Sequence, residues 1–171
     1  MNYLSYYSSP LGKMALLSDR EKLTAILFCG QRFYNERMEC EHEEKDLPVF
    51  TRTKEWLDIY FTGKNPKFTP PVSLYGTPFQ LSVWNLITNI PYGETVTYGE
   101  LAQKIASANG ISKMSARAVG AAVGRNPISI IIPCHRVIGS NGNLTGYSGG
   151  IDKKLKLLQL EQANVTHMPT L

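Results

Sequence analysis

A thiol and an imidazole stand side by side at Cys134 and His135, within the stretch IIIPCHRVIG (130–139). A cysteine is inert in apolar surroundings, but it becomes a nucleophile when a base or a cation lowers its pKa. Adjacent side chains on an extended chain point apart, so these two can cooperate only if the backbone turns or a water bridges them. Pro133 favours a turn, because proline cannot continue the hydrogen-bonded ladder of a strand. The pair therefore indicates nucleophilic chemistry.

A histidine that acts as a base needs an acceptor on its second ring nitrogen to hold the ring in place. Glu161 is the candidate, since it follows Leu157, Leu158 and Leu160 at the apolar boundary of an expected helix in DKKLKLLQLEQA (152–163). Simple surface exposure explains the same pattern equally well. The residue pattern by itself leaves both interpretations open.

A glycine-rich loop, NGNLTGYSGG (141–150), lies between the Cys–His pair and this expected helix. Tyr147 and Ser148 stand between its glycines. Such a loop suits a backbone that closes on a flat ligand with two hydroxyls pointing inward, and a plain surface loop is the alternative.

The N-terminal part has the patterns of a small sheet. YLSYYSS, KMALLS and LTAILFCG alternate with turn residues and are typical of strands. The charge-rich stretch ERMECEHEEKD (36–46) is expected to be an exposed or mobile loop. Residues 47–62 have apolar side chains at helical spacing, and the proline-rich stretch 64–76 is interpreted as a linker.

The C-terminal part is predicted to be mainly helical. Two capping boxes, Thr77 to Gln80 and Thr97 to Glu100, predict helix starts. A third helix should begin near Ser112 or Ser115 and end at Gly124, which gives a helix-turn-helix, and the isoleucines 130–132 are typical of a buried strand. The predicted fold class is α/β (α+β), with a small-sheet domain and linker over 1–75 and a helix-turn-helix domain over 76–171.

One face of the third helix is almost bare. Arg117, Gly120, Ala121 and Gly124 share it at i, i+3, i+4 and i+7. Each glycine inside a helix costs about 1 kcal/mol against alanine, so another surface should approach closely there. That surface could be a second helix or a nucleic-acid backbone, and the helix taken alone favours helix packing.

The composition is that of a globular cytoplasmic protein, with 43% hydrophobic and 19% charged residues and no apolar run of membrane-spanning length. Three cysteines without paired spacing argue against disulfides, and Cys40 and His42 are too close in sequence for usual zinc ligands, so no metal is expected. Residues 1–76 hold ten Lys/Arg and ten Asp/Glu, whereas residues 77–171 hold eight and four. The whole net charge of +4 therefore lies in the C-terminal part, where it would attract a polyanion.

Five stretches in order over residues 76–161 closely resemble the 6-O-alkylguanine-DNA alkyltransferases, also called methylated-DNA–protein-cysteine methyltransferases: GTPFQLSVW, IPYGETVTYGELA, SARAVGAAVGRNPISIIIPCHRVIG, GYSGG and KLKLLQLE. The N-terminal part matches only in outline, as a ribonuclease-H-like domain. The resemblance implies a monomeric DNA repair protein that needs no cofactor and binds double-stranded DNA in the minor groove. It would flip out 6-O-methylguanine, with 4-O-methylthymine as a second substrate, and transfer the alkyl group irreversibly to its own cysteine in one turnover.

Carried over residue by residue, the resemblance makes Cys134 the alkyl acceptor and His135 the base that takes its proton through a water. Glu161 would orient His135, and Asn126 would hold the active-site turn. Within the substrate pocket, Val137 would read the exocyclic amine of guanine through its carbonyl. Tyr147 and Ser148 would form the pocket wall, with the serine approaching the alkylated oxygen.

The same resemblance implies a set of DNA contacts on and beside the third helix. Tyr98 would help rotate the target phosphate and border the substrate, and Arg117 would enter the base stack in place of the flipped nucleotide. The DNA-binding set comprises Tyr98, Ser115, Ala116, Arg117, Gly120 and Arg125. The stretch 103–114 is longer than in many members, so the conformation of this loop stays open.

Two other functions compete with this interpretation. A thiol hydrolase also uses cysteine with histidine, but it needs an oxyanion hole and does not explain Arg117 or the bare helix face. A DNA-binding module of the alkyltransferase-like kind carries a different residue at the cysteine position, and Cys134 argues against it here.

Overall fold

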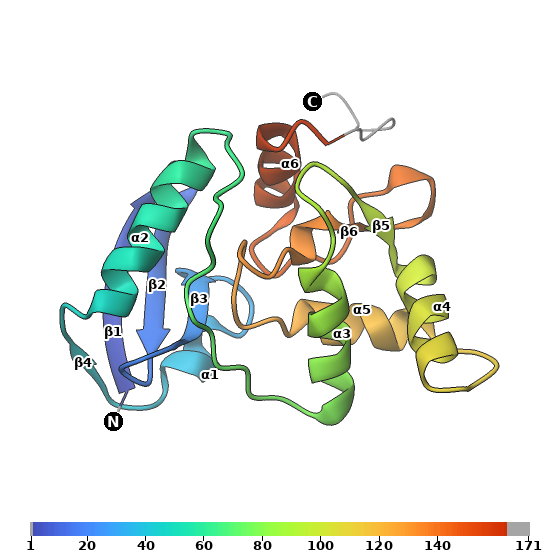
Figure 1. Ribbon diagram of the computed structural model, residues 1–171, viewed down its shortest axis with the longest axis horizontal. Helices are drawn as coiled ribbons and strands as arrows, with labels where there is room; N and C mark the ends of the chain where they lie inside the picture. The colour runs from blue at the N-terminus through green and yellow to red at the C-terminus, as the bar shows by residue number, and fades with distance from the viewer. Residues whose placement is uncertain (1, 164–171) are drawn as a thin grey trace. The chain divides into compact units, whose positions relative to one another are not determined.

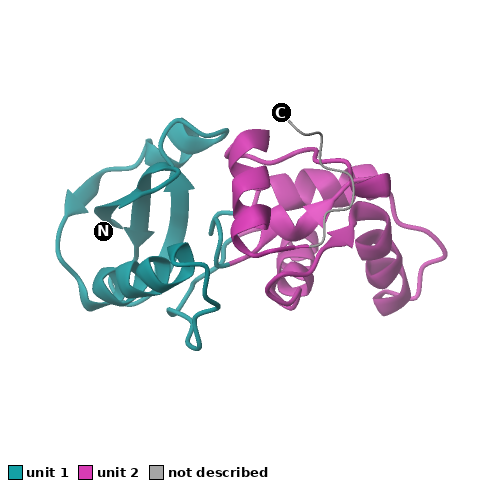
Figure 2. Ribbon diagram, turned by 90° about the horizontal axis from the view of Figure 1, so that it is seen from above, with its two compact units in different colours: residues 1–75, 127–131 teal, residues 76–126, 132–171 magenta. Residues whose placement is uncertain are grey.

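The computed structural model describes residues 2–163, and the chain divides into two compact units (Figure 2). Unit 1 comprises Met1–Tyr75 with Pro127–Ile131, and unit 2 comprises Gly76–Asn126 with Ile132–Leu171. An N-terminal sheet and a largely helical C-terminal part confirm the predicted α/β class (Figure 1). No helix among the described residues is long and apolar enough to cross a membrane.

Unit 1 is built on a four-stranded sheet in the order β3-β2-β1-β4. Its strands are β1 (Asn2–Ser9), β2 (Gly12–Ser18), β3 (Leu23–Phe28) and β4 (His42–Glu44). The first three pair antiparallel through short turns, and β4 pairs parallel with β1. β2 and β3 are apolar almost throughout, which is typical of strands buried on both faces.

Helices cover the two faces of this sheet. On one face, Tyr7 of β1 donates a hydrogen bond to Asp58 of α2 (Pro48–Phe61) over 2.7 Å. On the other face, a buried cluster that includes Leu4 and Leu17 packs against Tyr34 and Met38 of the short helix α1 (Tyr34–Met38). Alternate residues of each strand therefore contribute to two separate apolar layers.

Two stretches of unit 1 differ from the expectation. Residues 36–46 were expected to form an exposed or mobile loop; most of them are exposed, but they contain the end of α1 and the strand β4. The proline-rich stretch 64–76 also contributes a bridge, because Val72 pairs with Leu23 of β3. Backbone pairing to a neighbouring strand, which local composition does not reveal, orders both stretches.

Unit 2 begins with two capped helices. In α3 (Pro78–Thr88) and α4 (Tyr98–Ala108), the N-cap threonine accepts from the backbone of the third helical residue, whose side chain accepts from the threonine N–H. Both predicted capping boxes are thus present. α5 (Ala116–Gly124) follows α4 after residues 109–115, and this pair forms the helix-turn-helix. The Trp84 indole donates to the Ala122 carbonyl over 2.9 Å and ties α3 to α5.

The isoleucines 130–132, predicted as a strand, form a turn instead. Ile130 has a φ of 71°, and the nearest bridge is made by Ile128 with Ile26 of β3. After the turn come the 3-10 helix η1 (Cys134–Arg136), the strand β6 (Val137–Ile138), the 3-10 helix η2 (Ser140–Gly142) and α6 (Ile151–Leu160). β6 pairs parallel with β5 (Val96–Thr97).

Candidate active site

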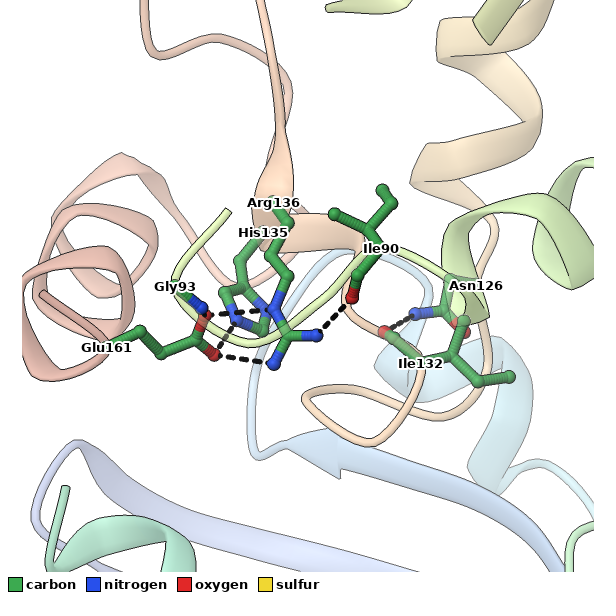
Figure 3. Close-up of polar contacts among 7 residues, drawn as sticks. All are labelled: Ile90, Gly93, Asn126, Ile132, His135, Arg136 and Glu161. Carbon is green, nitrogen blue, oxygen red and sulfur yellow. Dashed lines mark hydrogen bonds and ion pairs between the residues drawn. The ribbon is translucent and has the colours of Figure 1, made fainter. Parts of the chain in front are cut away.

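Cys134 and His135 lie on a tight turn, not on a strand. Cys134 N–H donates to the Ile132 carbonyl over 2.8 Å, and Arg136 N–H donates to the Pro133 carbonyl over 2.9 Å. The buried Asn126 side chain donates to the same Ile132 carbonyl over 2.8 Å (Figure 3). The backbone turn that Pro133 favours is therefore fixed by an amide side chain from the end of α5.

The Cys134 thiol is almost enclosed, with 7% of the residue exposed. Burial raises its pKa, because the charged thiolate loses its hydration. The Asn126 side chain and the positive charge of Lys154 act in the opposite direction. The resting sulfur is consequently a thiol that needs a base before it can attack.

The structure places His135 and Glu161 in direct contact. His135 is fully buried, and its Nε2 lies 2.7 Å from Glu161 Oε1 (Figure 3). With the shared proton on Nε2, a neutral ring carries its lone pair on Nδ1. Glu161 is 3% exposed, so the alternative of surface exposure for this carboxylate is wrong.

Glu161 is held by more than the histidine. Arg136 donates through Nε to Oε2 over 2.9 Å and through Nη2 to Oε1 over 3.0 Å. Gly93 N–H donates to Oε2 over 3.3 Å, and the remaining arm of Arg136 donates to the Ile90 carbonyl over 2.6 Å (Figure 3). The carboxylate is thereby fixed by charge-assisted hydrogen bonds on both oxygens.

These contacts set the charges of the cluster. Burial alone would raise the Glu161 pKa, but the hydrogen bond from His135 and the Arg136 guanidinium outweigh it and hold this pKa well below its usual range. Burial lowers the His135 pKa, and the Glu161 carboxylate only partly opposes that effect. At neutral pH the site therefore combines a carboxylate, a neutral imidazole and a thiol, which is the arrangement that general-base activation requires.

The glycine-rich loop and α4 meet near this turn. Tyr98 donates to the Thr145 carbonyl over 3.0 Å, and burial together with the Cys134 charge raises the Tyr98 pKa to about 12. Tyr147 is buried, and its hydroxyl has no hydrogen-bond partner among the described residues. Ser148 donates its hydroxyl proton to the Gly124 carbonyl over 2.6 Å, which ties the loop to the end of α5.

Five of the six predicted DNA-binding residues lie on α5 or at its two ends. Ser115 caps α5 by accepting from Ala118 N–H over 3.3 Å, and Ala116 and Arg117 are exposed in its first turn. Gly120 is half-buried, and Arg125 follows the last turn. These five residues lie on or next to α5, whereas Tyr98, the sixth of the predicted set, is the first residue of α4 and lies beside the thiol cluster.

Two residues of the cluster received no role from the sequence, namely Arg136 and Lys154. Arg136 stands within the Pro-Cys-His-Arg-Val stretch, but nothing local indicates that its side chain folds back onto Glu161. Lys154 precedes Leu157, Leu158 and Glu161 at i+3, i+4 and i+7, so helical periodicity could have placed it on the buried face. Among residues 2–163, no group of three or more His, Cys, Asp or Glu side chains is arranged to hold a metal ion.

A helix-turn-helix unit that buries an activatable cysteine beside a fixed histidine–glutamate pair defines a DNA-binding protein with a nucleophilic thiol. Residues 78–163 match the DNA-binding domain of 6-O-methylguanine DNA methyltransferase, and residues 2–74 match its ribonuclease-like domain. The chain belongs to the 6-O-methylguanine DNA methyltransferase family, a family of DNA repair methyltransferases, as the sequence predicted.

Curated relatives and solved structures agree with this assignment. Methylated-DNA–protein-cysteine methyltransferases from Haemophilus influenzae and Methanosarcina acetivorans are each 43% identical, over 94% and 93% of this chain and 86% and 97% of their own. The structure of Mycobacterium tuberculosis OGT in complex with DNA matches with a TM-score of 0.82 at 38% identity, over 96% of this chain and 97% of that one. The expected enzyme class is thereby confirmed.

Proposed function

We propose that the protein repairs DNA by transferring the alkyl group of 6-O-methylguanine, and of 4-O-methylthymine, to Cys134 in a single turnover. The observation that carries this proposal is the buried thiol on η1, next to a neutral imidazole whose Nε2 is 2.7 Å from a fully hydrogen-bonded carboxylate. No other described cysteine has such surroundings, since Cys29 and Cys40 are exposed.

In the proposed reaction, His135 accepts the thiol proton, through a water, and the sulfur attacks the alkyl carbon. A carbon–sulfur bond forms while the carbon–oxygen bond breaks, and its electron pair passes to the guanine. The imidazolium returns the proton to the leaving base. The product is a thioether, which water does not cleave, so each molecule reacts once.

The base must leave the duplex to reach this sulfur, because Cys134 is almost fully buried. We propose that α5 enters the minor groove and that Arg117 fills the vacated place in the stack. The bare face of α5 supports this role, since a Cβ at Gly124 would meet no atom within 4 Å and one at Gly120 would make only an ordinary contact of 3.6 Å with Tyr98. Packing among the described residues therefore does not require these glycines.

We propose that three residues recognise the flipped base in the pocket. The Val137 carbonyl would read the guanine amine, and Tyr147 and Ser148 would wall the base. Because Ser148 donates its proton to Gly124 in this structure, we propose that its hydroxyl rotates when the alkylated oxygen arrives. A cytoplasmic monomer bound to duplex DNA would suffice for the reaction, because every group named lies in one chain.

The test uses the full chain and a duplex that carries one 6-O-methylguanine. The intact mass should rise by one methyl group, and trypsin should place it on peptide 126–136, where Cys134 is the sole cysteine. Cys134→Ser should abolish transfer but retain lesion binding, because a hydroxyl is far less ionised than a thiol. Methylation of Cys29 or Cys40 instead, or no mass change, would overturn the proposal.

A further inference from the structure

Lys154 on α6 is fully buried, with an exposed fraction of 0%. Lysine is almost never buried to this extent unless its charge is paired, since an ammonium group loses a large hydration energy inside a protein. None of the ion pairs found among the described residues includes Lys154. Glu161, the buried carboxylate of this unit, is already bonded to His135 and Arg136. The buried ammonium therefore needs another explanation.

The hydrogen bonds of Lys154 connect the reactive segment to the glycine-rich loop. Its Nζ donates to the Val137 carbonyl over 2.5 Å and to the Thr145 carbonyl over 2.8 Å. The Tyr98 hydroxyl donates to the same Thr145 carbonyl, and the Tyr98 ring centroid lies 5.7 Å from Nζ. Three segments of unit 2 thus converge on one ammonium group. All of these contacts are neutral dipoles, so they fix the position of the charge without neutralising it.

The geometry places Cys134 close to this charge, because Val137, whose carbonyl accepts from Lys154 Nζ, donates its own N–H to the Cys134 carbonyl. Burial lowers the Lys154 pKa to about 8, and a negative charge on Cys134 acts to raise it. In return, the Lys154 charge acts to lower the pKa of the thiol, against the effect of burial. Each group favours the charged form of the other, and both are enclosed where electrostatic interactions are weakly screened.

We propose that Lys154 is a positioning residue of alkyl transfer: its buried ammonium is the counter-ion of the Cys134 thiolate, and its hydrogen bonds hold β6 against the glycine-rich loop. This role rests on the proposed function, because alkyl transfer requires a thiolate. Without Lys154, the His135 imidazolium alone would have to balance the negative charge of that thiolate. Alkylation removes the negative charge from the sulfur, so Lys154 then loses its counter-ion.

The other groups that face Cys134 do not replace this charge. Asn126 contributes a neutral amide, and the phenols of Tyr98 and Tyr147 both have a pKa raised by burial and by the Cys134 charge, so they stay protonated at neutral pH. His135 becomes positive only while it holds the thiol proton. At neutral pH, Lys154 is therefore the described side chain that acts on this sulfur with a positive charge before the thiol loses its proton.

The experiment measures the reaction of Cys134 with iodoacetamide as a function of pH, followed on tryptic peptide 126–136 so that Cys29 and Cys40 do not interfere. Lys154→Met removes the charge and the hydrogen bonds, and Lys154→Gln removes the charge but keeps a donor. Both should move the midpoint of the pH profile up by about one unit and slow the reaction roughly tenfold below that midpoint. Lys156→Met, an exposed lysine on the same helix, should leave the profile unchanged.

Several outcomes would overturn the proposal. An unshifted profile in a folded Lys154→Met protein would show that the charge does not act on the sulfur. A wild-type profile in Lys154→Gln would show that Lys154 only clamps the two carbonyls. The reaction with iodoacetamide requires no DNA, so it tests the two proposals separately. If the Lys154 variants shift the profile but the wild-type protein does not demethylate DNA, the counter-ion role stands and the proposed function is rejected.

A second measurement guards against variants that fail to fold. Coupling between two titrating groups is reciprocal, so loss of the thiolate should lower the Lys154 pKa by as much as loss of the lysine raises the thiol pKa. This measurement keeps Lys154 in place. NMR titration of the Lys154 Cε resonance should give a lower Lys154 pKa in Cys134→Ser than in the wild-type protein. Equal values would contradict the proposed pair.

Discussion

Within residues 2–163, the Glu161 carboxylate accepts hydrogen bonds from His135, from two nitrogens of Arg136 and from Gly93. A carboxylate bonded in this way serves two purposes that are easily confused. It orients the imidazole, and it neutralises a buried guanidinium. Removing it would disturb both, so a single substitution cannot separate chemistry from stability.

A double-mutant cycle separates these purposes. Glu161→Gln should cost roughly 3 kcal/mol of unfolding free energy, because Arg136 would remain as an unpaired buried charge. Arg136→Met should cost a similar amount, because the buried Glu161 carboxylate would lose its positively charged partner. The double variant should recover much of the stability in urea titrations. It should not recover the rate of alkyl transfer, because the neutral amide of Gln does not stabilise the imidazolium that forms when His135 takes the thiol proton.

Recovery of both the unfolding free energy and the rate of alkyl transfer in the double variant would contradict the role of Glu161 in orienting His135. If the double variant regains the wild-type rate of reaction with free 6-O-benzylguanine, Glu161 acts only as the partner of Arg136. The free base is the appropriate substrate, because its reaction does not depend on DNA binding.

The pH dependence of stability follows from the same cluster. The His135 pKa is lowered from 6.5 in the folded protein, so its contribution is complete above pH 6.5 and is lost as the pH falls through the folded value. The Glu161 pKa is lowered from 4.5, so its contribution is lost only at still lower pH. Urea titrations should therefore show a decline that begins below pH 6.5 and steepens below pH 4.5. His135→Gln should remove the first decline and keep the second, and an unchanged first decline would mean that another group causes it.

At the scale of elements, local sequence determines where the helices of unit 2 begin. Thr77 and Thr97 cap α3 and α4 through bonds that span three residues, so the capping boxes could be predicted from the sequence. The turn at Ile130 could not be predicted, because its φ of 71° is imposed by pairing of residues 127–129 with β3. A run of three isoleucines favours a strand wherever tertiary contacts do not override it.

The same distinction applies to the site. Cys134 and His135 were evident as chemical groups, and the resemblance supplied their relation to Glu161. The residues alone left Glu161 undecided, and Arg136 and Lys154 were not identified, because the burial of a charged side chain depends on what surrounds it in three dimensions. The fold brings these charges together from η1 and α6.

The helix α5 supports a prediction about Arg117, which is exposed in its first turn. A phosphate contact contributes to binding of every duplex about equally, whereas a residue that fills the flipped base's place offsets unstacking. Arg117→Ala should therefore slow repair of 6-O-methylguanine in a paired duplex far more than reaction with free 6-O-benzylguanine. The repair rate of Arg117→Ala should also fall less when the target base is mismatched or in single-stranded DNA. Lys113→Ala, in the turn before α5, is the control for loss of one positive charge. If the reaction with the free base slows equally, Arg117 supports the pocket and does not fill the place of the flipped base in the stack.

At the scale of the whole molecule, the chain crosses between the two units just before the reactive turn. It leaves unit 2 after Asn126, contributes residues 127–131 to unit 1 and re-enters unit 2 at Ile132. Within unit 1, Ile26 N–H donates to the Pro127 carbonyl and Ser129 N–H donates to the Ile26 carbonyl, both over 2.9 Å. Ile128 is fully buried. Residues 127–131 therefore belong to the core of one unit, although they lead directly to Cys134 in the other. The sheet of unit 1 therefore holds residues 127–131, and the chain re-enters unit 2 at Ile132, two residues before Cys134.

This arrangement predicts that a cavity in unit 1 affects chemistry in unit 2 only when it lies under the returning segment. Ile128→Ala should cost about 2–4 kcal/mol, as large-to-small core substitutions do. Leu57→Ala in α2, which is equally buried in unit 1 but outside that segment, should cost a similar amount. At a temperature well below both melting transitions, Ile128→Ala should react with free 6-O-benzylguanine several-fold more slowly than Leu57→Ala, because only Ile128 anchors the chain that enters η1. Hydrogen exchange at Cys134 N–H should be faster in Ile128→Ala alone. Equal rates in the two variants would show that the reactive turn is held entirely by Asn126 and its own hydrogen bonds.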